Sequence, residues 1–190
     1  MIAPEPKRIL IIRLSAIGDV VFASPLVAAC IKRYPKAEID WLAEGVVRPL
    51  LTELPGLNKV ILWPRQEWQD LWREKRFVAL FSAVAAFRRK LRARNYDLVI
   101  DAQGLVKSAF LAWLTGSRQR IGFKSKEPNG MFLTDRYEKS ITSRISSEYL
   151  ALANTLGWDT SSFEMVLGLS ASDDARATDL APEAPYVVVA

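Results

Sequence analysis

Residues 8–21 of the chain read RILIIRLSAIGDVV, and this stretch decides the fold. A short run rich in β-branched residues is typical of a strand buried in a parallel sheet. The run ends in a Ser-x-x-Gly-Asp turn that passes directly into a helical pattern. Because open α/β sheets bind their ligands at such strand-to-helix turns, we expect a Rossmann-like sheet with a ligand near this turn.

The turn itself leaves two interpretations of Asp19 open. Gly18 permits close approach of a ligand to the backbone, and Asp19 falls in the first helical turn, where free N–H groups and the helix dipole favour negative charge. Asp19 is therefore either a helix cap or a functional carboxylate. The turn contains neither the three glycines of a dinucleotide fingerprint nor a P-loop Gly-Lys-Ser/Thr, which argues against nicotinamide chemistry and P-loop phosphoryl transfer.

Composition narrows the chemistry further. The 190 residues suit one large domain, half of them are hydrophobic, and the chain contains one cysteine and no histidine. The absence of histidine excludes Ser-His-Asp and Cys-His catalysis and imidazole metal sites, so a general base would be a carboxylate. Cys30 is expected to be a packing residue, and a single cysteine, which forms no internal disulfide, suits a reducing cytoplasm.

Strand-like apolar runs alternate with longer helical patterns along the chain. Residues 1–7 are polar and contain two prolines, which is not a signal-peptide pattern, and no apolar run is long enough to span a membrane. Repeated βα units imply right-handed crossovers and a parallel sheet with helices on both faces. The patterns predict strands over 8–14, 38–43, 59–63, 96–101 and 120–123, and helices over 20–34, 46–52, 77–94, 103–114 and 143–156.

The C-terminal residues predict a change of organisation. Residues 170–185 are rich in Ala, Asp, Ser and Pro, which is typical of a linker, and residues 186–190 (YVVVA) begin a new buried-strand pattern. We therefore expect a first domain over 1–169, a linker over 170–185, and the first strand of a second domain over 186–190. The alternative is that residues 186–190 add a strand to the first sheet.

Positive charge is concentrated in one segment. Residues 63–95 contain nine basic and three acidic residues, whereas the whole chain has a net charge of +5. The same segment contains Trp63, Trp68 and Trp72, and aromatic rings beside cations suit a lipid headgroup boundary, a sugar face or a nucleic-acid strand. The segment predicts an anionic partner, although the run over 88–94 is equally consistent with a solvated helix face.

Three segments together resemble a known family: ILIIRLSAIGDV (9–20), IDWLAEG (39–45) and NYDLVIDAQGLVKSA (95–109). In this order and spacing they resemble the lipopolysaccharide heptosyltransferases, glycosyltransferases of the GT-B architecture that add heptose to the inner core. The third segment is most similar to the branch that adds the first heptose to a Kdo sugar on lipid A. The resemblance implies that this chain is the N-terminal half of a two-domain enzyme.

The resemblance also implies that the two domains bind different substrates. In the family, the N-terminal domain receives the acceptor and the C-terminal domain holds ADP-heptose, so residues 1–190 alone would be inactive. The implied reaction is an inverting displacement without metal or cofactor, with Asp19 as the base that deprotonates the acceptor hydroxyl. The residues expected to bind the acceptor are Ser15, Gly18, Arg65, Arg73, Arg76, Gln103, Lys107, Lys124 and Lys126.

Two departures from the family pattern leave open whether the enzyme adds the first or the second heptose. Residues 126–128 read Lys-Glu-Pro where the first-heptose enzymes have Arg-Glu-Pro, and lysine lacks the bidentate fork of arginine. The helix over 143–156 offers Arg144 and Glu148 in place of a His and Arg pair.

The expected partners are a Kdo-lipid A acceptor, ADP-heptose bound through the second domain, and the inner membrane surface from its cytoplasmic face. The alternative is a basic, Trp-rich α/β module that binds nucleic acid or another anion without catalysis.

Overall fold

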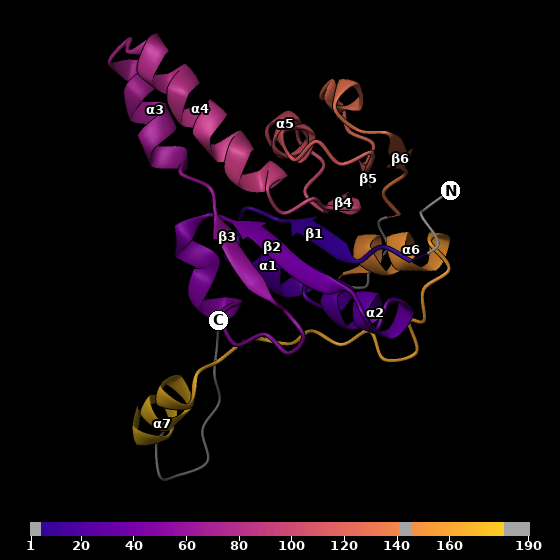
Figure 1. Ribbon diagram of the computed structural model, residues 1–190. Coiled ribbons are helices and arrows are strands. Elements are labelled where there is room, and N and C mark those ends of the chain that lie inside the picture. The colour runs from indigo at the N-terminus through magenta and orange to yellow at the C-terminus, as the bar shows by residue number, and fades with distance from the viewer. Residues whose placement is uncertain (1–4, 141–145, 181–190) are drawn as a thin grey trace.

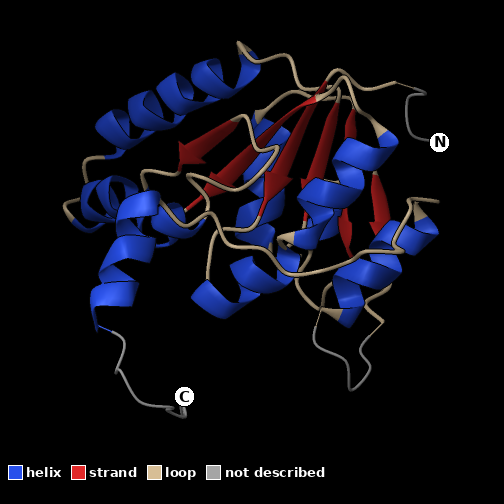
Figure 2. Cartoon of the chain, turned by 90° about the horizontal axis from the view of Figure 1, so that it is seen from below, coloured by secondary structure: helices blue, strands red, loops and turns tan. Residues whose placement is uncertain are grey.

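A computed structural model describes residues 5–140 and 146–180. Within these residues the chain forms one fully parallel sheet of six strands, in the order β3-β2-β1-β4-β5-β6. Figure 2 shows the strands of this sheet in red with helices around it. The strands are β1 (Arg8–Ile12), β2 (Glu38–Ala43), β3 (Lys59–Leu62), β4 (Leu98–Asp101), β5 (Gln119–Phe123) and β6 (Asp135–Tyr137). This order confirms the predicted Rossmann-like α/β fold.

Helices cover both faces of the sheet (Figure 1). Along β1, Ile9 and Ile11 pack into one hydrophobic core, and Leu10 and Ile12 pack into the other, so both faces of this strand are apolar. The helices are α1 (Ile17–Ala23), α2 (Pro25–Arg33), α3 (Arg65–Arg73), α4 (Phe77–Arg92), α5 (Val106–Leu114), α6 (Ser147–Thr155) and α7 (Ala171–Leu180), with two 3₁₀ helices, η1 (Gly45–Leu50) and η2 (Asn129–Met131). Helices α1, α2 and α6 pack on the first core, and α4 and α5 on the second.

Several predicted boundaries were wrong, each for a local reason. The helix predicted over 20–34 is two helices, since Pro25 starts a new helix after Ser24. The segment predicted as a helix over 46–52 is the 3₁₀ helix η1, which contains Pro49. Helix α3 and the short, largely exposed edge strand β6 were not predicted. The first residues of the helix predicted over 143–156, Arg144 among them, lie outside the described residues.

The strand order places a topological switch point between β1 and β4. The chain leaves β1 for α1 on one face of the sheet, and leaves β4 for α5 on the opposite face. The two turns therefore separate at the carboxyl edge of the sheet, where doubly wound sheets form their ligand crevice. The turn that contains Asp19 lies at this switch point.

Helix α7 occupies the first part of the segment predicted as a linker. The Ser170 side chain donates a hydrogen bond to Asp173 Oδ2 at 2.6 Å, and the Asp173 N–H donates to Ser170 Oγ at 3.2 Å, an arrangement typical of a helix start. In Figure 1 this helix lies apart from the sheet. Residues 181–185 of the predicted linker and the strand predicted over 186–190 lie outside the described residues. Among the described helices, none combines the length and apolar character that crossing a bilayer requires.

Candidate functional site

The turn after β1 holds Asp19 in two ways at once. Its carboxylate accepts a hydrogen bond from the Ala16 N–H at 3.3 Å, which caps helix α1. The same oxygen, Oδ2, forms an ion pair with Nη2 of Arg13. The Asp19 side chain is nevertheless 44% exposed, whereas that of Arg13 is 8% exposed. Asp19 is therefore a cap and also a fixed carboxylate that a substrate can reach.

Arg13 links the turn to both neighbouring strands. Its Nη1 donates a hydrogen bond to the carbonyl of Ala102, which follows β4, at 3.2 Å. Its own carbonyl accepts a hydrogen bond from the indole N–H of Trp41 in β2 at 3.0 Å. Sequence reasoning missed Arg13, although a cation that interrupts an otherwise apolar strand pattern was the available signal. The bond to Ala102 fixes the guanidinium and the bond from Trp41 fixes the backbone of Arg13, so this side chain orients the Asp19 carboxylate.

The turn after β4 brings Gln103 to the same place. Asp101 Oδ1 accepts hydrogen bonds from the N–H groups of Gln103 and Gly104, each at 3.0 Å. Gly104 adopts a φ of +74°, which favours glycine, and an added Cβ would lie 3.1 Å from Cβ of Phe123. Gln103 Oε1 in turn accepts a hydrogen bond from the Leu14 N–H at 3.0 Å. The structure thus joins Gln103 to the turn that holds Ser15, Gly18 and Asp19.

Asp101 is a fully buried carboxylate beneath this turn. Burial raises its pKa from 3.8 to about 6, while the hydrogen bonds from Gly104 and Gln103 and the charge of Arg13 act in the opposite direction. Its second oxygen, Oδ2, is buried and has no hydrogen-bond partner. In the unfolded chain the carboxyl group has its ordinary pKa, so between pH 4 and 6 the folded state binds more protons than the unfolded state.

We expect Asp101→Asn to remove a pH dependence of stability. In the wild type, Asp101 makes the free energy of unfolding fall as pH rises from about 4 to about 6, by roughly 3 kcal/mol, and stay level above that range. The amide keeps an acceptor for the two backbone N–H groups and does not titrate. Urea unfolding at pH 4 and pH 7 measures the difference between the two proteins. If the free energy of unfolding changed by the same amount between pH 4 and pH 7 in wild type and variant, the raised pKa of Asp101 would be contradicted.

Helix α6 packs on the same hydrophobic core as α1. Tyr149 is almost completely buried, and burial raises the pKa of its phenol, while the positive charge of Arg13 acts to lower it. The charges of Glu148 and Asp19 also raise this pKa, which places α6 beside the turn. Glu148, which the sequence singled out, lies in the first turn of α6.

A second group of charges lies next to the turn, where β2 and β3 end. Glu44 donates its backbone N–H to the Leu14 carbonyl at 3.0 Å, so the group adjoins the end of β1. Its 13% exposed carboxylate accepts from Arg65 Nη1 at 2.9 Å and lies 4.0 Å from Lys107 Nζ. Lys107 Nζ also lies 6.0 Å from the centre of the Trp63 ring. This group lies beside a hollow of about 410 Å³, whose lining includes Glu44, Trp63, Arg65 and a second carboxylate, Glu67.

The loop after β5 reaches the same edge of the sheet. Glu127 accepts a hydrogen bond from the Val106 N–H at 2.7 Å, so the Lys-Glu-Pro segment is held against the start of α5. The buried Asn129 donates to the Phe123 carbonyl at 2.8 Å and to the Gly104 carbonyl at 3.3 Å. Lys126 is exposed beside Glu127, whereas Lys124 forms an ion pair with Glu138.

Arg73 and Arg76 lie away from the carboxyl edge of the sheet. Both are exposed, at the end of α3 and in the following turn, and the paired helices α3 and α4 carry them beyond the sheet (Figure 1). The predicted acceptor residues therefore divide into one group around Asp19, one around Glu44, Lys124 and Lys126 in the loop after β5, and this distant pair. Glu44, like Arg13, was missed as a site residue.

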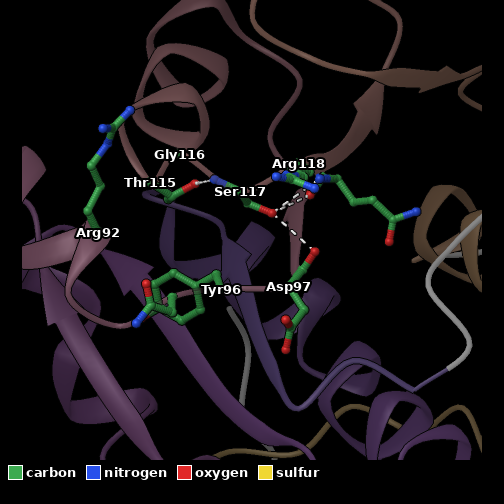
Figure 3. Close-up of a pocket in the computed structure, with 9 residues that line it drawn as sticks. Arg92, Tyr96, Asp97, Thr115, Gly116, Ser117 and Arg118 are labelled. Carbon is green, nitrogen blue, oxygen red and sulfur yellow. Dashed lines mark hydrogen bonds between the residues drawn. The ribbon is translucent and has the colours of Figure 1, made fainter.

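A hollow at the opposite edge of the sheet differs from this site. It has a volume of about 530 Å³ and is lined by residues that precede β4 and β5, among them Tyr96, Asp97 and Arg118 (Figure 3). The Ser117 hydroxyl donates to the Asp97 carbonyl at 3.1 Å, and the Ser117 N–H donates to Thr115 Oγ1 at 3.1 Å. These side chains form hydrogen bonds with the backbone of the two turns that precede β4 and β5. Asp19 lies at the opposite ends of the strands.

The tryptophans of the basic segment do not form a stacking platform. Trp68 packs edge-to-face between Trp63, at 6.0 Å, and Phe87, at 5.6 Å, so its ring is held in a hydrophobic layer. Of the three tryptophans, Trp72 alone is largely exposed, at 63%. One exposed indole does not favour the nucleic-acid alternative, which requires a series of free ring faces. Over the described residues, no cluster of three or more His, Cys, Asp or Glu side chains is placed to hold a metal ion.

Comparisons with known proteins agree on one family. The sequence profile of glycosyltransferase family 9 (heptosyltransferase) matches residues 84–190. Lipopolysaccharide heptosyltransferase 1 of Escherichia coli strain K12 is 37% identical over 105 residues, which are 55% of this chain and 32% of that protein. The enzyme of the same name from Pseudomonas aeruginosa is 30% identical over 133 residues, 64% of this chain and 34% of its own length.

A solved structure extends the similarity over most of the chain. The E. coli heptosyltransferase WaaC with ADP-2-deoxy-2-fluoro heptose matches with a TM-score of 0.69 and 27% identity, over 82% of this chain and 50% of that one. The chain thus spans about a third of the length of the curated relatives it matches, and half of this structure.

Proposed function

The chain belongs to glycosyltransferase family 9, the heptosyltransferases, and we propose that it is the acceptor-binding part of an enzyme of lipopolysaccharide core biosynthesis. The proposed reaction transfers heptose from ADP-heptose to a Kdo sugar, or a first heptose, on lipid A. The observation that carries the proposal is Asp19, a half-exposed carboxylate fixed by Arg13 at the switch point of the sheet.

Asp19 is the proposed general base. Its carboxylate takes the proton of the acceptor hydroxyl while that oxygen forms a bond to the anomeric carbon of heptose. The bond between this carbon and the diphosphate oxygen breaks, and ADP leaves with the bonding electron pair. Attack from the face opposite the leaving group inverts the anomeric configuration. Arg13 and the Ala16 N–H contribute by holding the carboxylate in one orientation, which lowers the entropic cost of reaching the transition state.

Arg65 and Lys107 are the proposed acceptor-binding cations. Kdo carries a carboxylate, and each of the two cationic heads beside Glu44 can meet an anionic group of the acceptor. Ser15, Gly18 and Gln103 line the same edge and are proposed to contact the sugar. Lys124 and Lys126, in the loop after β5, are also proposed to contact the acceptor, although the charge of Lys124 is paired with Glu138. Arg73 and Arg76 are proposed to meet the membrane surface near the lipid part of the acceptor.

The donor is proposed to bind outside residues 1–190. The chain matches half of the WaaC structure, and its first strand-to-helix turn presents the Asp19 carboxylate where a diphosphate requires free N–H groups. We propose a protein on the cytoplasmic face of the inner membrane that works without metal or nucleic-acid partner. Residues 1–190 alone are proposed to bind acceptor without turnover.

The transfer reaction tests this proposal. The protein that includes its donor-binding part is incubated with ADP-heptose and Kdo-lipid A, and mass spectrometry detects the product. The expected result is one added heptose and release of ADP. Absence of product with both Kdo-lipid A and a heptosylated acceptor would contradict the proposal.

A further inference from the structure

The far end of the α3–α4 pair carries a cluster of exposed apolar side chains. Trp72 is 63% exposed, Phe77 45%, Val78 85% and Phe81 75%. The Trp72 and Phe77 rings meet edge-to-face with their centres 5.5 Å apart. These four residues, called the apolar tip, come from the last turn of α3 and the first two turns of α4.

The apolar tip is a local feature of an otherwise packed pair of helices. Nearer the sheet, Trp68 contacts Trp63 and Phe87, and Phe87 and Leu91 of α4 are buried in the second core. The pair is therefore anchored at its base, and its far end projects from the body of the molecule (Figure 1). The fold holds the tip in water, where its apolar surface is unfavourable unless a partner covers it.

The charges around the tip indicate which partner. Arg73, Lys75 and Arg76 lie between the two tip segments, and the acidic groups that meet them are Asp70, 3.4 Å from Arg73, and Glu74, 3.2 Å from Arg76. The cations Arg88, Arg89, Lys90 and Arg92 lie at the other end of α4, near its buried base, and do not flank the tip. Apolar and aromatic groups flanked by cations match the boundary between acyl chains and anionic headgroups.

We propose that the apolar tip inserts shallowly into the anionic surface of a lipid bilayer, with Arg73, Lys75 and Arg76 at the headgroups. The insertion itself rests on the exposed residues, and its use in presenting the acceptor rests on the proposed function. Helix α3 rises about 1.5 Å per residue, so Arg65 at its start lies about 12 Å from Arg73 at its end. Helix α3 then acts as a spacer, which sets the acceptor-binding edge above the headgroups, where the sugars of a glycolipid project.

A fluorescent label at the tip tests insertion directly. Cys30 is fully buried, so Val78→Cys supplies a single reactive thiol in the folded chain for an environment-sensitive fluorophore. With vesicles of phosphatidylcholine and about 30% phosphatidylglycerol, the emission is expected to shift to shorter wavelength, and lipids with shallow spin labels to quench it more than deep ones. Met165→Cys, an exposed apolar position on the other side of the sheet, is the matched control and should stay in water.

Substitution of the tip tests its contribution to affinity. Val78→Ser combined with Phe81→Ser is expected to weaken vesicle binding at least about tenfold, because two apolar side chains no longer leave water. Both positions are exposed, so the fold should be unaffected, and circular dichroism checks it. Met165→Ser should leave vesicle binding unchanged.

Three results would overturn the inference: a label at position 78 that stays in water, unchanged vesicle affinity of the double variant, or a dimer that the double variant dissociates. The last would show that a second copy of the chain covers the tip. Binding of a soluble Kdo saccharide, measured on the same variants, separates the two proposals. If the protein binds the Kdo saccharide but not vesicles, the membrane insertion is contradicted and the proposed function is not. If it binds vesicles but not the Kdo saccharide, the insertion is supported and the proposed function is contradicted.

Discussion

Asp19→Asn is expected to lower the rate of heptose transfer about 100- to 10,000-fold, the usual cost of losing a positioned general base. The amide has the same size and can still accept the hydrogen bond from the Ala16 N–H, so helix α1 keeps its cap. It cannot take the proton of the acceptor hydroxyl. Donor binding should be nearly unchanged, because the donor contacts are proposed to lie outside residues 1–190. Transfer rates and ADP-heptose affinity of the two-domain protein measure both effects.

Two outcomes separate a base from a cap at this position. A variant that keeps more than about a tenth of the wild-type rate would show that Asp19 only caps the helix. Asp159→Asn is the matched control, since Asp159 is an exposed aspartate that meets Lys32 at 3.5 Å, on the loop that follows α6. This control should retain full activity.

Arg65→Gln combined with Lys107→Gln is expected to raise the KM for the Kdo-bearing acceptor about 10- to 100-fold. Each cation is proposed to meet an anionic group of the acceptor, and hydrogen bonds that involve a charged group contribute about 1.5 to 3 kcal/mol, less where solvent reaches them. The value of kcat should change far less, because neither side chain is proposed to act on the reacting bond. Steady-state kinetics with varied acceptor provide both constants.

The control for this pair lies at the opposite edge of the sheet. Arg118 is exposed beside the hollow that precedes β4 and β5, and Arg118→Gln should leave the acceptor KM unchanged. The double variant leaves the largely buried Glu44 without its two cations, so its stability is checked by urea unfolding. A folded double variant with the wild-type KM would remove Arg65 and Lys107 from the acceptor site.

The sheet could be predicted from the sequence because its signals are local. The run that became β1 is continuous and apolar after Arg8, as a strand buried on both faces requires. The predicted extents of β1 and β2 agree with the structure to within two residues. The split between α1 and α2 was also local in origin, since Pro25 was visible in the sequence. Helix α3 was missed because none of its residues is fully buried and its pattern is dominated by polar side chains.

The site could be predicted only in part. The position of Asp19 in the first turn of α1 followed from the Ser-x-x-Gly-Asp pattern, and the structure joins Gln103 to this turn through the Leu14 N–H. The role of Arg13 depends on Ala102 and Trp41, which are 89 and 28 residues away along the chain. No local pattern encodes such contacts, because they arise only when β1 lies between β2 and β4.

The ligand preference of the isolated chain tests the central claim, that residues 1–190 carry the acceptor side of the enzyme. Isothermal titration calorimetry compares a soluble Kdo-bearing saccharide with ADP-heptose. The expected result is measurable binding of the Kdo saccharide, and weak or no binding of ADP-heptose, since the Asp19 carboxylate opposes a diphosphate at the turn after β1. Micromolar binding of ADP-heptose without binding of the Kdo saccharide would contradict the account and assign the donor to this half.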